Sequence, residues 1–244
     1  MERFLNKVAI VTGSSSGIGA AVAHQLAREG ASVVINSSSS VEAGRGVAIG
    51  LDRSLYVQAD ISRADDAQRL INETINHFGR LDILVNNAAI TKSIPHADLD
   101  LVTDEIFEDI LRVNVIGGFR LIKLALPHLR ASGDGAVVNV TSIAGVRPTG
   151  SSIPYAVSKA AMNHLTQLVA NVTGPTVRVN AIAPGLVRTP WTTDWGAVHD
   201  AMEHLAPLGR SAEPDDIAVA VCDACASPYL TGQVIVVDGG LTLR

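Results

Sequence analysis

The chain has 244 residues, of which 47% are hydrophobic and 18% charged, and its formal net charge is −5. This length fits one α/β domain, and the composition is typical of a globular protein and not of a disordered one. The acidic balance argues against nucleic acid or an anionic membrane as a partner, because no basic excess exists to bind phosphate groups. The N-terminus lacks the apolar region of a signal peptide and no apolar run approaches about 18 residues, so we expect a cytoplasmic protein without a membrane span.

Short β-rich runs alternate with amphipathic stretches along the chain, which indicates βαβ units and a parallel sheet. The first strand is a continuous apolar run, as expected for a strand buried on both faces. The expected strands are residues 7–12, 32–36, 55–59, 82–86, 136–140, 177–182 and 234–237. The expected helices are residues 17–28, 41–49, 64–78, 103–129 with a weak point at Gly117 and Gly118, one that carries Tyr155 and runs to residue 172, and 214–226. Residues 188–208 show little periodicity.

A glycine-rich segment, residues 12–19, lies where the first strand meets the first helix. Glycines there let the backbone approach a pyrophosphate, and the helix N-terminus offers free N–H groups and the positive end of the helix dipole. The pattern is G-x-x-x-G-x-G and not the more familiar G-x-G-x-x-G, and such a turn can also be purely structural. Its position at the first strand–helix junction favours dinucleotide binding.

Tyr155 and Lys159 are four residues apart, so on a helix their side chains lie on one face. A nearby lysine cation favours the phenolate and lowers the phenol pKa, which would make Tyr155 a proton donor and acceptor near neutral pH. A tyrosine and a lysine four residues apart are also common on solvated helix faces. The catalytic interpretation of Tyr155 and Lys159 therefore depends on the other motifs of the chain.

Cys222 and Cys225 have the C-x-x-C spacing of some redox and zinc sites. A structural zinc site needs four ligands, and the sequence has no second cysteine pair and no clustered histidines. We therefore expect two buried helix residues and no metal site.

Together these motifs resemble the short-chain dehydrogenase/reductase family. The match runs from Lys7 to Gly240 and rests on residues 12–19, the Asn86-Asn87-Ala88-Ala89 segment, Asn114, Ser142, the Tyr155/Lys159 pair, Pro184-Gly185 and Asp238-Gly239-Gly240, in that order. The resemblance implies an α/β fold, namely one Rossmann-type domain over residues 1–244 with a doubly wound parallel seven-stranded sheet flanked by helices. It also implies an NAD(P)-dependent oxidoreductase that interconverts a carbonyl and a secondary alcohol by hydride transfer.

The resemblance assigns catalytic roles to Asn114, Ser142, Tyr155 and Lys159. Tyr155 is the general acid/base, Lys159 supports its phenolate and binds the nicotinamide ribose, and Ser142 holds the carbonyl oxygen. Asn114 holds a water for proton relay through Lys159. The expected cofactor-binding residues are Gly13, Ser16, Gly17, Ile18, Gly19, Asn36, Ser37, Ser38, Asp60, Ile61, Asn87, Ala88, Tyr155, Lys159, Pro184, Gly185, Val187 and Thr189.

We expect NADP(H) to be preferred, with NAD(H) as the alternative cofactor. Asn36 ends the second predicted strand, where NAD-preferring relatives carry an acid for the ribose 2′-hydroxyl. Ser37, Ser38 and Ser39 offer hydroxyls and backbone N–H groups to a 2′-phosphate. No arginine or lysine stands at position 37 or in the glycine turn, so the discrimination is expected to be modest.

The substrate is expected to be a small-molecule carbonyl or alcohol, with a 3-oxoacyl thioester (acyl-carrier-protein) substrate as the alternative. A non-catalytic cofactor-binding regulator is the rival class, but it would not need the complete set Asn114, Ser142, Tyr155 and Lys159. Residues 188–208 are expected to form a substrate lid, with Trp191 and Trp195 covering an apolar part of the substrate. The alternative is that both tryptophans pack onto the domain or into a subunit contact.

A homotetramer is expected, partly from the resemblance. The predicted helix at residues 103–129 carries apolar residues on more than one face, although packing on a sheet needs only one stripe. The last strand, residues 234–237, is apolar on both faces and would lie at a sheet edge that has to be covered.

Overall fold

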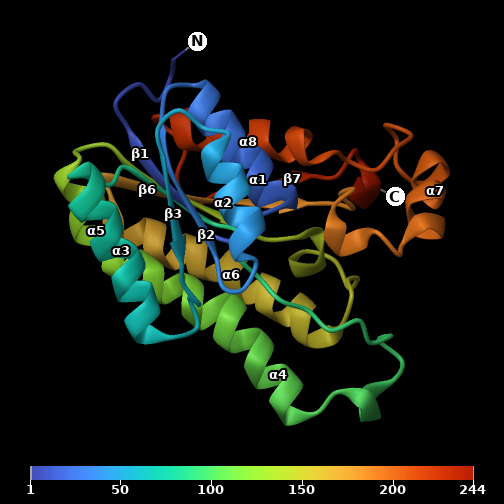
Figure 1. The fold of residues 1–244 in the computed structure, drawn as a ribbon. Coiled ribbons are helices and arrows are strands. Elements are labelled where there is room, and N and C mark those ends of the chain that lie inside the picture. Colours follow the sequence, from blue (N-terminus) through green and yellow to red (C-terminus); the bar gives the residue numbers. More distant parts are fainter. Residues whose placement is uncertain (1, 244) are drawn as a thin grey trace.

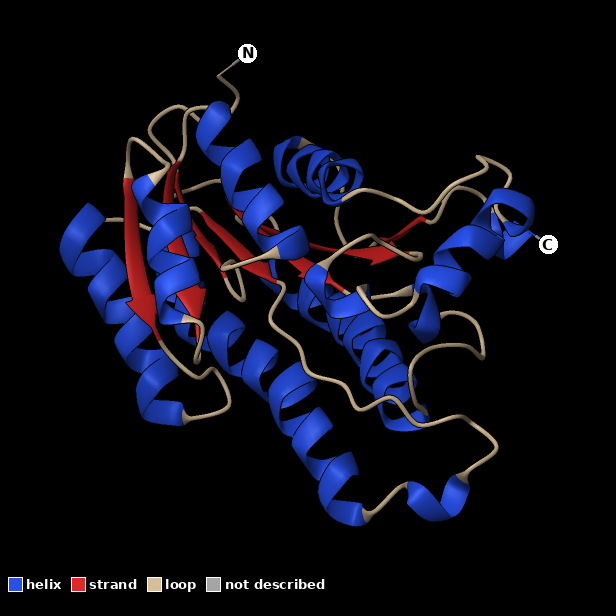
Figure 2. Ribbon diagram, turned by 45° about the vertical axis from the view of Figure 1, so that its right-hand side comes forward, coloured by secondary structure: helices blue, strands red, loops and turns tan. Residues whose placement is uncertain are grey.

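The computed structural model describes residues 2–243 and has a central parallel sheet with helices on both faces (Figures 1 and 2). The 7-stranded sheet has the order β3-β2-β1-β4-β5-β6-β7. The chain moves outward from β1 to β3 and then crosses back to β4, so the switch in direction falls between β1 and β4. Ligands of open α/β sheets bind at such a switch point. The strands are β1 (Val8–Val11), β2 (Ser32–Ser37), β3 (Ser54–Gln58), β4 (Ile83–Asn86), β5 (Gly135–Val140), β6 (Val177–Pro184) and β7 (Val234–Val237).

The helices form a layer on each face of the sheet (Figure 2). One layer contains α1 (Gly17–Arg28), α2 (Val41–Ile49) and α8 (Pro214–Ala226), and the other contains α3 (Ala64–Phe78), α5 (Gly118–Ala131) and α6 (Ile153–Thr173). Helix α4 (Asp104–Leu111) packs on α6, and α7 (Gly196–Leu205) lies apart, close to the C-terminus (Figure 1). No helix within residues 2–243 has both the length and the apolar character needed to cross a membrane.

Two hydrophobic cores fill the space between the sheet and its two helical layers. Successive strand residues point to opposite faces, so Val11 belongs to the α1–α8 core while its neighbour Ile10 belongs to the α3–α5–α6 core. Cys222 and Cys225 are free and buried in the first core. Burial raises the pKa of the Cys225 thiol to about 12, which fits a packing role and not a redox one. The expected fold class is confirmed.

Two segments differ from the expectation. The helix predicted over residues 103–129 is divided into α4 and α5 by a wider π-helical turn, Arg112–Gly117, and the irregularity therefore begins before the Gly117-Gly118 weak point. Residues 188–208 contain a short 3-10 turn, Pro190–Thr192, and the helix α7, which the weak periodicity did not reveal. Helix α7 buries mainly His199 and Met202, so it has too narrow a buried stripe to produce a clear pattern.

Candidate active site

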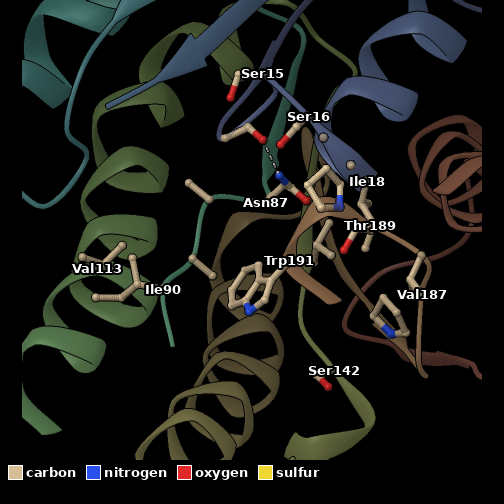
Figure 3. A pocket seen from close by; sticks show the side chains of 18 of the residues that line it. Ser15, Ser16, Ile18, Asn87, Ile90, Val113, Ser142, Val187, Thr189 and Trp191 are labelled. Carbon is tan, nitrogen blue, oxygen red and sulfur yellow. Dashed lines mark hydrogen bonds between the residues drawn. The ribbon is translucent and has the colours of Figure 1, made fainter. Parts of the chain in front are cut away.

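A cavity of about 450 Å³ lies beyond the carboxyl ends of the strands, between the glycine-rich turn and the segment before α7. Figure 3 shows Ser15, Ser16 and Ile18 at one end of this pocket and Ser142 at the other, with Trp191 between them. The structure brings together nearly every residue expected at the site. The lining includes Gly13, Ser16, Gly17, Ile18, Gly19, Asn36, Ser37, Ser38, Asp60, Ile61, Asn87, Ala88, Ser142, Tyr155, Lys159, Pro184, Gly185, Val187 and Thr189.

The glycine-rich turn presents the N-terminus of α1 to the pocket. Ser16 is the N-cap in an extended conformation, and its side chain makes no capping hydrogen bond, so it does not satisfy the first N–H groups of the helix. Gly19 is required by packing, because a Cβ there would collide with the carbonyl oxygen of Gly13. These features fit the pyrophosphate of a dinucleotide, which would accept hydrogen bonds from the N–H groups of the turn.

Thr12 and Asn87 join the ends of the two central strands β1 and β4. The Asn87 amide donates to the carbonyl oxygens of Thr12 and Gly13 at 2.9 and 3.0 Å, and the Thr12 hydroxyl accepts from the backbone N–H groups of Asn87 and Ala88, both at 3.0 Å. These bonds fix the glycine-rich turn against the segment after β4. The glycine-rich turn and the segment after β4, which line the pocket on two sides, are therefore held together at the switch point of the sheet.

Asn36 does not have the position expected for a cofactor-selecting residue at the strand end. Strand β2 extends to Ser37, and the Asn36 amide donates to the carbonyl oxygens of Val57 and Ala59 at 3.1 and 3.0 Å. The side chain is buried beneath the glycine-rich turn, where its oxygen accepts from Gly13 N–H at 3.4 Å. The residue that ends the strand at the pocket is therefore Ser37, whose hydroxyl lies 2.9 Å from that of Tyr56.

Tyr155 and Lys159 lie in the first turns of α6, which begins at a well-defined cap. The Ser152 hydroxyl accepts from Tyr155 N–H at 3.4 Å, as an N-cap serine does. One turn later Lys159 is buried, and its Nζ donates to the carbonyl oxygen of Val140 at 2.9 Å. Gly145 lets the loop after β5 approach this turn, because a Cβ there would lie 2.6 Å from the Lys159 carbonyl carbon.

Ser142 follows β5 and faces the same end of the pocket. Its hydroxyl oxygen accepts from Ala144 N–H at 3.1 Å, which leaves the hydroxyl hydrogen free to be donated. Tyr155 lines the same pocket, and the Ser142 hydroxyl acts on its phenol in the direction that lowers the phenol pKa. Two hydroxyl groups therefore face one cavity, an arrangement that can hold a carbonyl oxygen.

Burial dominates the proton affinities of the pair. It raises the pKa of the Tyr155 phenol to about 12, with the Ser142 hydrogen bond opposing the shift. Burial also lowers the pKa of the Lys159 ammonium to about 8. The lysine Nζ lies 5.5 Å from the centroid of the tyrosine ring. Desolvation therefore sets the direction of the phenol pKa shift, and the lowering expected from Lys159 stays a prediction.

Asn114 is the expected catalytic residue that does not line the pocket. It lies in the π-helical turn, where its amide donates to the carbonyl oxygen of Ile90 and to the Ser158 hydroxyl, both at 3.0 Å, and its oxygen accepts from Ile90 N–H at 2.8 Å. Both amide hydrogens are thus used within the protein. The side chain fastens the loop after β4 to α6 directly behind Tyr155.

The pocket also contains residues that the sequence analysis did not single out. Trp191 and Trp195, predicted as substrate contacts, both line it. Apolar side chains from segments outside residues 188–208 also line the pocket. Figure 3 shows Ile90 and Val113 on the wall opposite Val187 and Thr189. No local motif marks such residues, since their only shared property is their place around the cavity. They include Ile90, Val113, Ser151, Leu186, Pro190 and Thr192.

Comparisons with known proteins identify the family. A family model described as enoyl-(acyl carrier protein) reductase matches residues 13–242. The chain is 53% identical over 239 residues, 97% of this chain and 96% of the relative, to a protein named as ketoacyl reductase 2 of the granaticin polyketide synthase of Streptomyces violaceoruber. It is 38% identical over 250 residues, 98% of this chain and 96% of the relative, to an A-factor type gamma-butyrolactone 1'-reductase of Streptomyces virginiae.

Solved structures show the same relationship. A short-chain dehydrogenase/reductase structure from Burkholderia xenovorans superposes with a TM-score of 0.91 at 39% identity, covering 98% of each chain. Members of this family use NAD(P) to transfer a hydride. The chain therefore belongs to the short-chain dehydrogenase/reductase family and is an NAD(P)-dependent oxidoreductase that interconverts a carbonyl and an alcohol.

Proposed function

We propose that this protein reduces a ketone with Tyr155 as the proton donor, and that NADP(H) is its preferred cofactor. The observation that carries the proposal is that Ser142, Tyr155 and buried Lys159 line one cavity together with the open N-terminus of α1. A protein that only sensed the cofactor would have no need of these three side chains in one cavity.

Each side chain of the set has a distinct task in this proposal. The bound nicotinamide supplies the hydride. Ser142 donates to the carbonyl oxygen of the substrate and orients it, and Tyr155 delivers its proton to that oxygen as negative charge develops there. Lys159, fixed by the Val140 carbonyl oxygen, keeps further N–H groups for the ribose and places positive charge beside the phenol. The Asn114 side chain holds the loop at Ile90 against α6. Because both of its amide hydrogens are used within the protein, a relay water near Lys159 would have to bind a backbone group instead.

The preference for NADP(H) is supported by the ribose end of the pocket. Residues 36–40 contain no acid that would repel a 2′-phosphate, and Ser37, Ser38 and Ser40 line the cavity there. The Ser37 hydroxyl is already hydrogen-bonded to the Tyr56 hydroxyl and the Ser40 carbonyl oxygen. The Ser38 hydroxyl is therefore the better candidate to bind a 2′-phosphate. Arg45 pairs with Glu42 on the surface of α2 and is not placed to bind a 2′-phosphate. The proposed preference for NADP(H) over NAD(H) is therefore moderate.

A 3-oxoacyl thioester is the second candidate substrate. It is favoured by the 53% identity to a protein named as a ketoacyl reductase. The apolar side chains around Trp191 would accept either an acyl chain or a cyclic group. The hydroxyls of Ser142 and Tyr155 would bind only the reacting carbonyl, so they do not distinguish the two substrates. The two candidates share the same chemistry at Tyr155 and differ in what fills the outer part of the pocket.

The test is a steady-state assay that follows oxidation of NADPH, with NADH in parallel. The panel should contain cyclic and acyclic diketones and 3-oxoacyl thioesters on pantetheine-type carriers. Turnover of ketones is expected, with a higher kcat/KM for NADPH. No turnover of any carbonyl, in a protein that binds NADPH, would contradict the proposed activity.

Three further features are part of the proposal. Residues 188–208 act as a substrate lid, supported by Trp191 and Trp195 in the pocket wall. The protein assembles as a homotetramer, supported by the exposed side chains of Phe119 on α5, Val172 on α6 and Val236 on the edge strand β7. Its cytoplasmic location remains a prediction from the sequence.

A further inference from the structure

Helix α7 carries a histidine that is buried beside the pocket without lining it. His199 is 4% exposed, and both of its ring nitrogens have partners. Nε2 lies 3.1 Å from the Thr192 hydroxyl oxygen, and Nδ1 lies 2.8 Å from the hydroxyl oxygen of buried Ser211. His199 therefore bridges the turn before α7 and the segment that leads into α8.

The hydrogen bonds around Thr192 fix the direction of this bridge. The Thr192 hydroxyl lies 2.8 Å from the Val187 carbonyl oxygen, which can only accept, so the hydroxyl hydrogen is donated there. The hydroxyl oxygen accepts from Thr189 N–H at 3.2 Å and has one more lone pair for His199. His199 Nε2 must then carry the hydrogen and donate it to Thr192. In the neutral ring, Nδ1 accepts from the Ser211 hydroxyl.

Thr192 is the centre of the turn that borders the cofactor. Its hydroxyl joins Val187 and Thr189, which both line the pocket, and Trp191 immediately precedes it. Figure 3 shows Val187, Thr189 and Trp191 around the cavity. A change in the position of Thr192 would move these side chains together. The bond from His199 ties the Thr192 side chain to α7, whereas the backbone of Thr192 accepts from Trp195 N–H, at the N-cap of α7, at 3.0 Å.

We propose that His199 is a positioning residue that holds the turn at residues 187–192, through Thr192, in the conformation that closes the cofactor pocket and presents Trp191 to Tyr155. This proposal rests on the proposed function only in taking the cavity as the cofactor and substrate site. His199 has no contact with the reacting atoms in this assignment. Its effect is therefore on binding and on the position of Trp191, and not on proton transfer.

Two substitutions separate the two ends of the bridge. In His199→Gln the amide nitrogen reaches the position of Nε2 and can still donate to Thr192. In His199→Asn the shorter amide reaches only the position of Nδ1, so it keeps a partner in Ser211 and loses Thr192. Ser211→Ala removes the opposite end alone and serves as the control, and Thr192→Val removes the centre of the turn with little change in shape.

The measurements are the Kd for NADPH, with NADH in parallel, the steady-state kcat and KM, the melting temperature, and Trp191 emission in a Trp195→Phe background. His199→Asn is expected to raise the cofactor Kd by about tenfold, the effect of losing one buried hydrogen bond. Thr192→Val also removes the bonds to Val187 and Thr189, so it should raise the Kd at least as much. Both variants should shift the Trp191 emission. His199→Gln and Ser211→Ala are expected to stay within about twofold of the parent protein in Kd. Values of kcat at saturation should change less than KM.

The proposal is overturned if His199→Gln is impaired as much as His199→Asn at a similar melting temperature, which would show a packing role. It is also overturned if His199→Asn and Thr192→Val bind cofactor like the parent protein. Should His199→Asn fail to fold, Thr192→Val compared with Ser211→Ala still shows whether loss of the partner of Nε2 weakens cofactor binding with His199 in place. Cofactor binding and Trp191 emission need no turnover, so failure of the proposed ketone reduction would be seen separately.

Discussion

The indole of Trp191 meets the phenol of Tyr155 edge to face, with ring centroids 6.2 Å apart and an angle of 67° between the ring planes. The two residues come from different elements, the turn before α7 and the first turn of α6. Trp191 is still 47% exposed, so its outer face remains open to a ligand. The contact makes the indole a wall of the space in which a carbonyl would approach the proton donor.

Replacement of Trp191 by alanine tests this wall. We expect Trp191→Ala to raise KM for bulky apolar carbonyls roughly 5- to 20-fold, because an aromatic contact is lost, and to leave the KM for small ketones and the cofactor Kd almost unchanged. Trp191→Phe is the matched control and should retain most of the affinity. Equal effects on small and bulky substrates would show that Trp191 supports the fold of the segment and does not contact substrate.

Removal of the Tyr155 hydroxyl tests the proposed general acid. Tyr155→Phe should lower kcat by about 10²- to 10⁴-fold, the usual contribution of a positioned proton donor. The ring and its packing against Trp191 are kept, so cofactor affinity and melting temperature should hardly change. Single-turnover kinetics with NADPH would measure the loss at the chemical step. A variant that turned over at nearly the normal rate would exclude Tyr155 from this role.

The pH dependence of reduction should reflect Lys159 and not Tyr155. The ammonium has a pKa lowered to about 8 by burial, whereas the phenol pKa is raised to about 12. As pH rises through about 8, Lys159 loses its charge while Tyr155 still carries its proton, so kcat/KM for the cofactor should fall. This parameter reports the free enzyme. A profile that stayed flat to the region of the phenol pKa would disprove the assignment.

Cofactor choice should respond to residue 37 and not to residue 36. Ser37→Asp places a carboxylate at the end of β2 beside the ribose site, where it repels a 2′-phosphate and can accept from a 2′-hydroxyl. The ratio of kcat/KM for NADPH to that for NADH should fall by at least about tenfold, since one unfavourable charge contact costs over 1 kcal/mol in a partly buried site.

The matched variant is Asn36→Asp. It removes the two amide bonds to Val57 and Ala59 and places negative charge beneath the glycine turn, so it should lower the melting temperature without a selective effect on NADPH. If Asn36→Asp switched the cofactor preference and Ser37→Asp did not, the reassignment of this position would be wrong.

Oligomer formation can be tested at two separate surfaces. Phe119→Glu on α5 and Val236→Lys on β7 each place a charge on an exposed apolar position, and neither residue lines the pocket. Light scattering of the parent protein is expected to give a tetramer mass. Each variant should give a dimer mass, because the proposed tetramer would place the two surfaces in different twofold interfaces. A monomer mass for the parent protein at micromolar concentration would refute the oligomer.

The sequence by itself determined the fold and the location of the site. Continuous apolar runs such as residues 8–11 mark strands buried on both faces, and their alternation with amphipathic stretches requires a parallel sheet. The glycine-rich turn and the Tyr155/Lys159 pair are local patterns whose spacing predicts their geometry. Residues far apart in the chain were assigned to one site by the resemblance to the family, which places the cofactor at the carboxyl ends of the strands.

Only the tertiary structure decided how these residues are used. The pKa of Tyr155 is raised by burial, which depends on packing between elements. The hydrogen bonds of the Asn36 amide likewise go to another strand, because Val57 lies in β3 and Ala59 just after it. Asn114 lies in the π turn and uses its amide on Ile90 and Ser158, and His199 gains its partners from the chain on both sides of α7. Local spacing fixes which face a side chain occupies, but hydrogen-bond partners and desolvation depend on packing between elements, which no local pattern records.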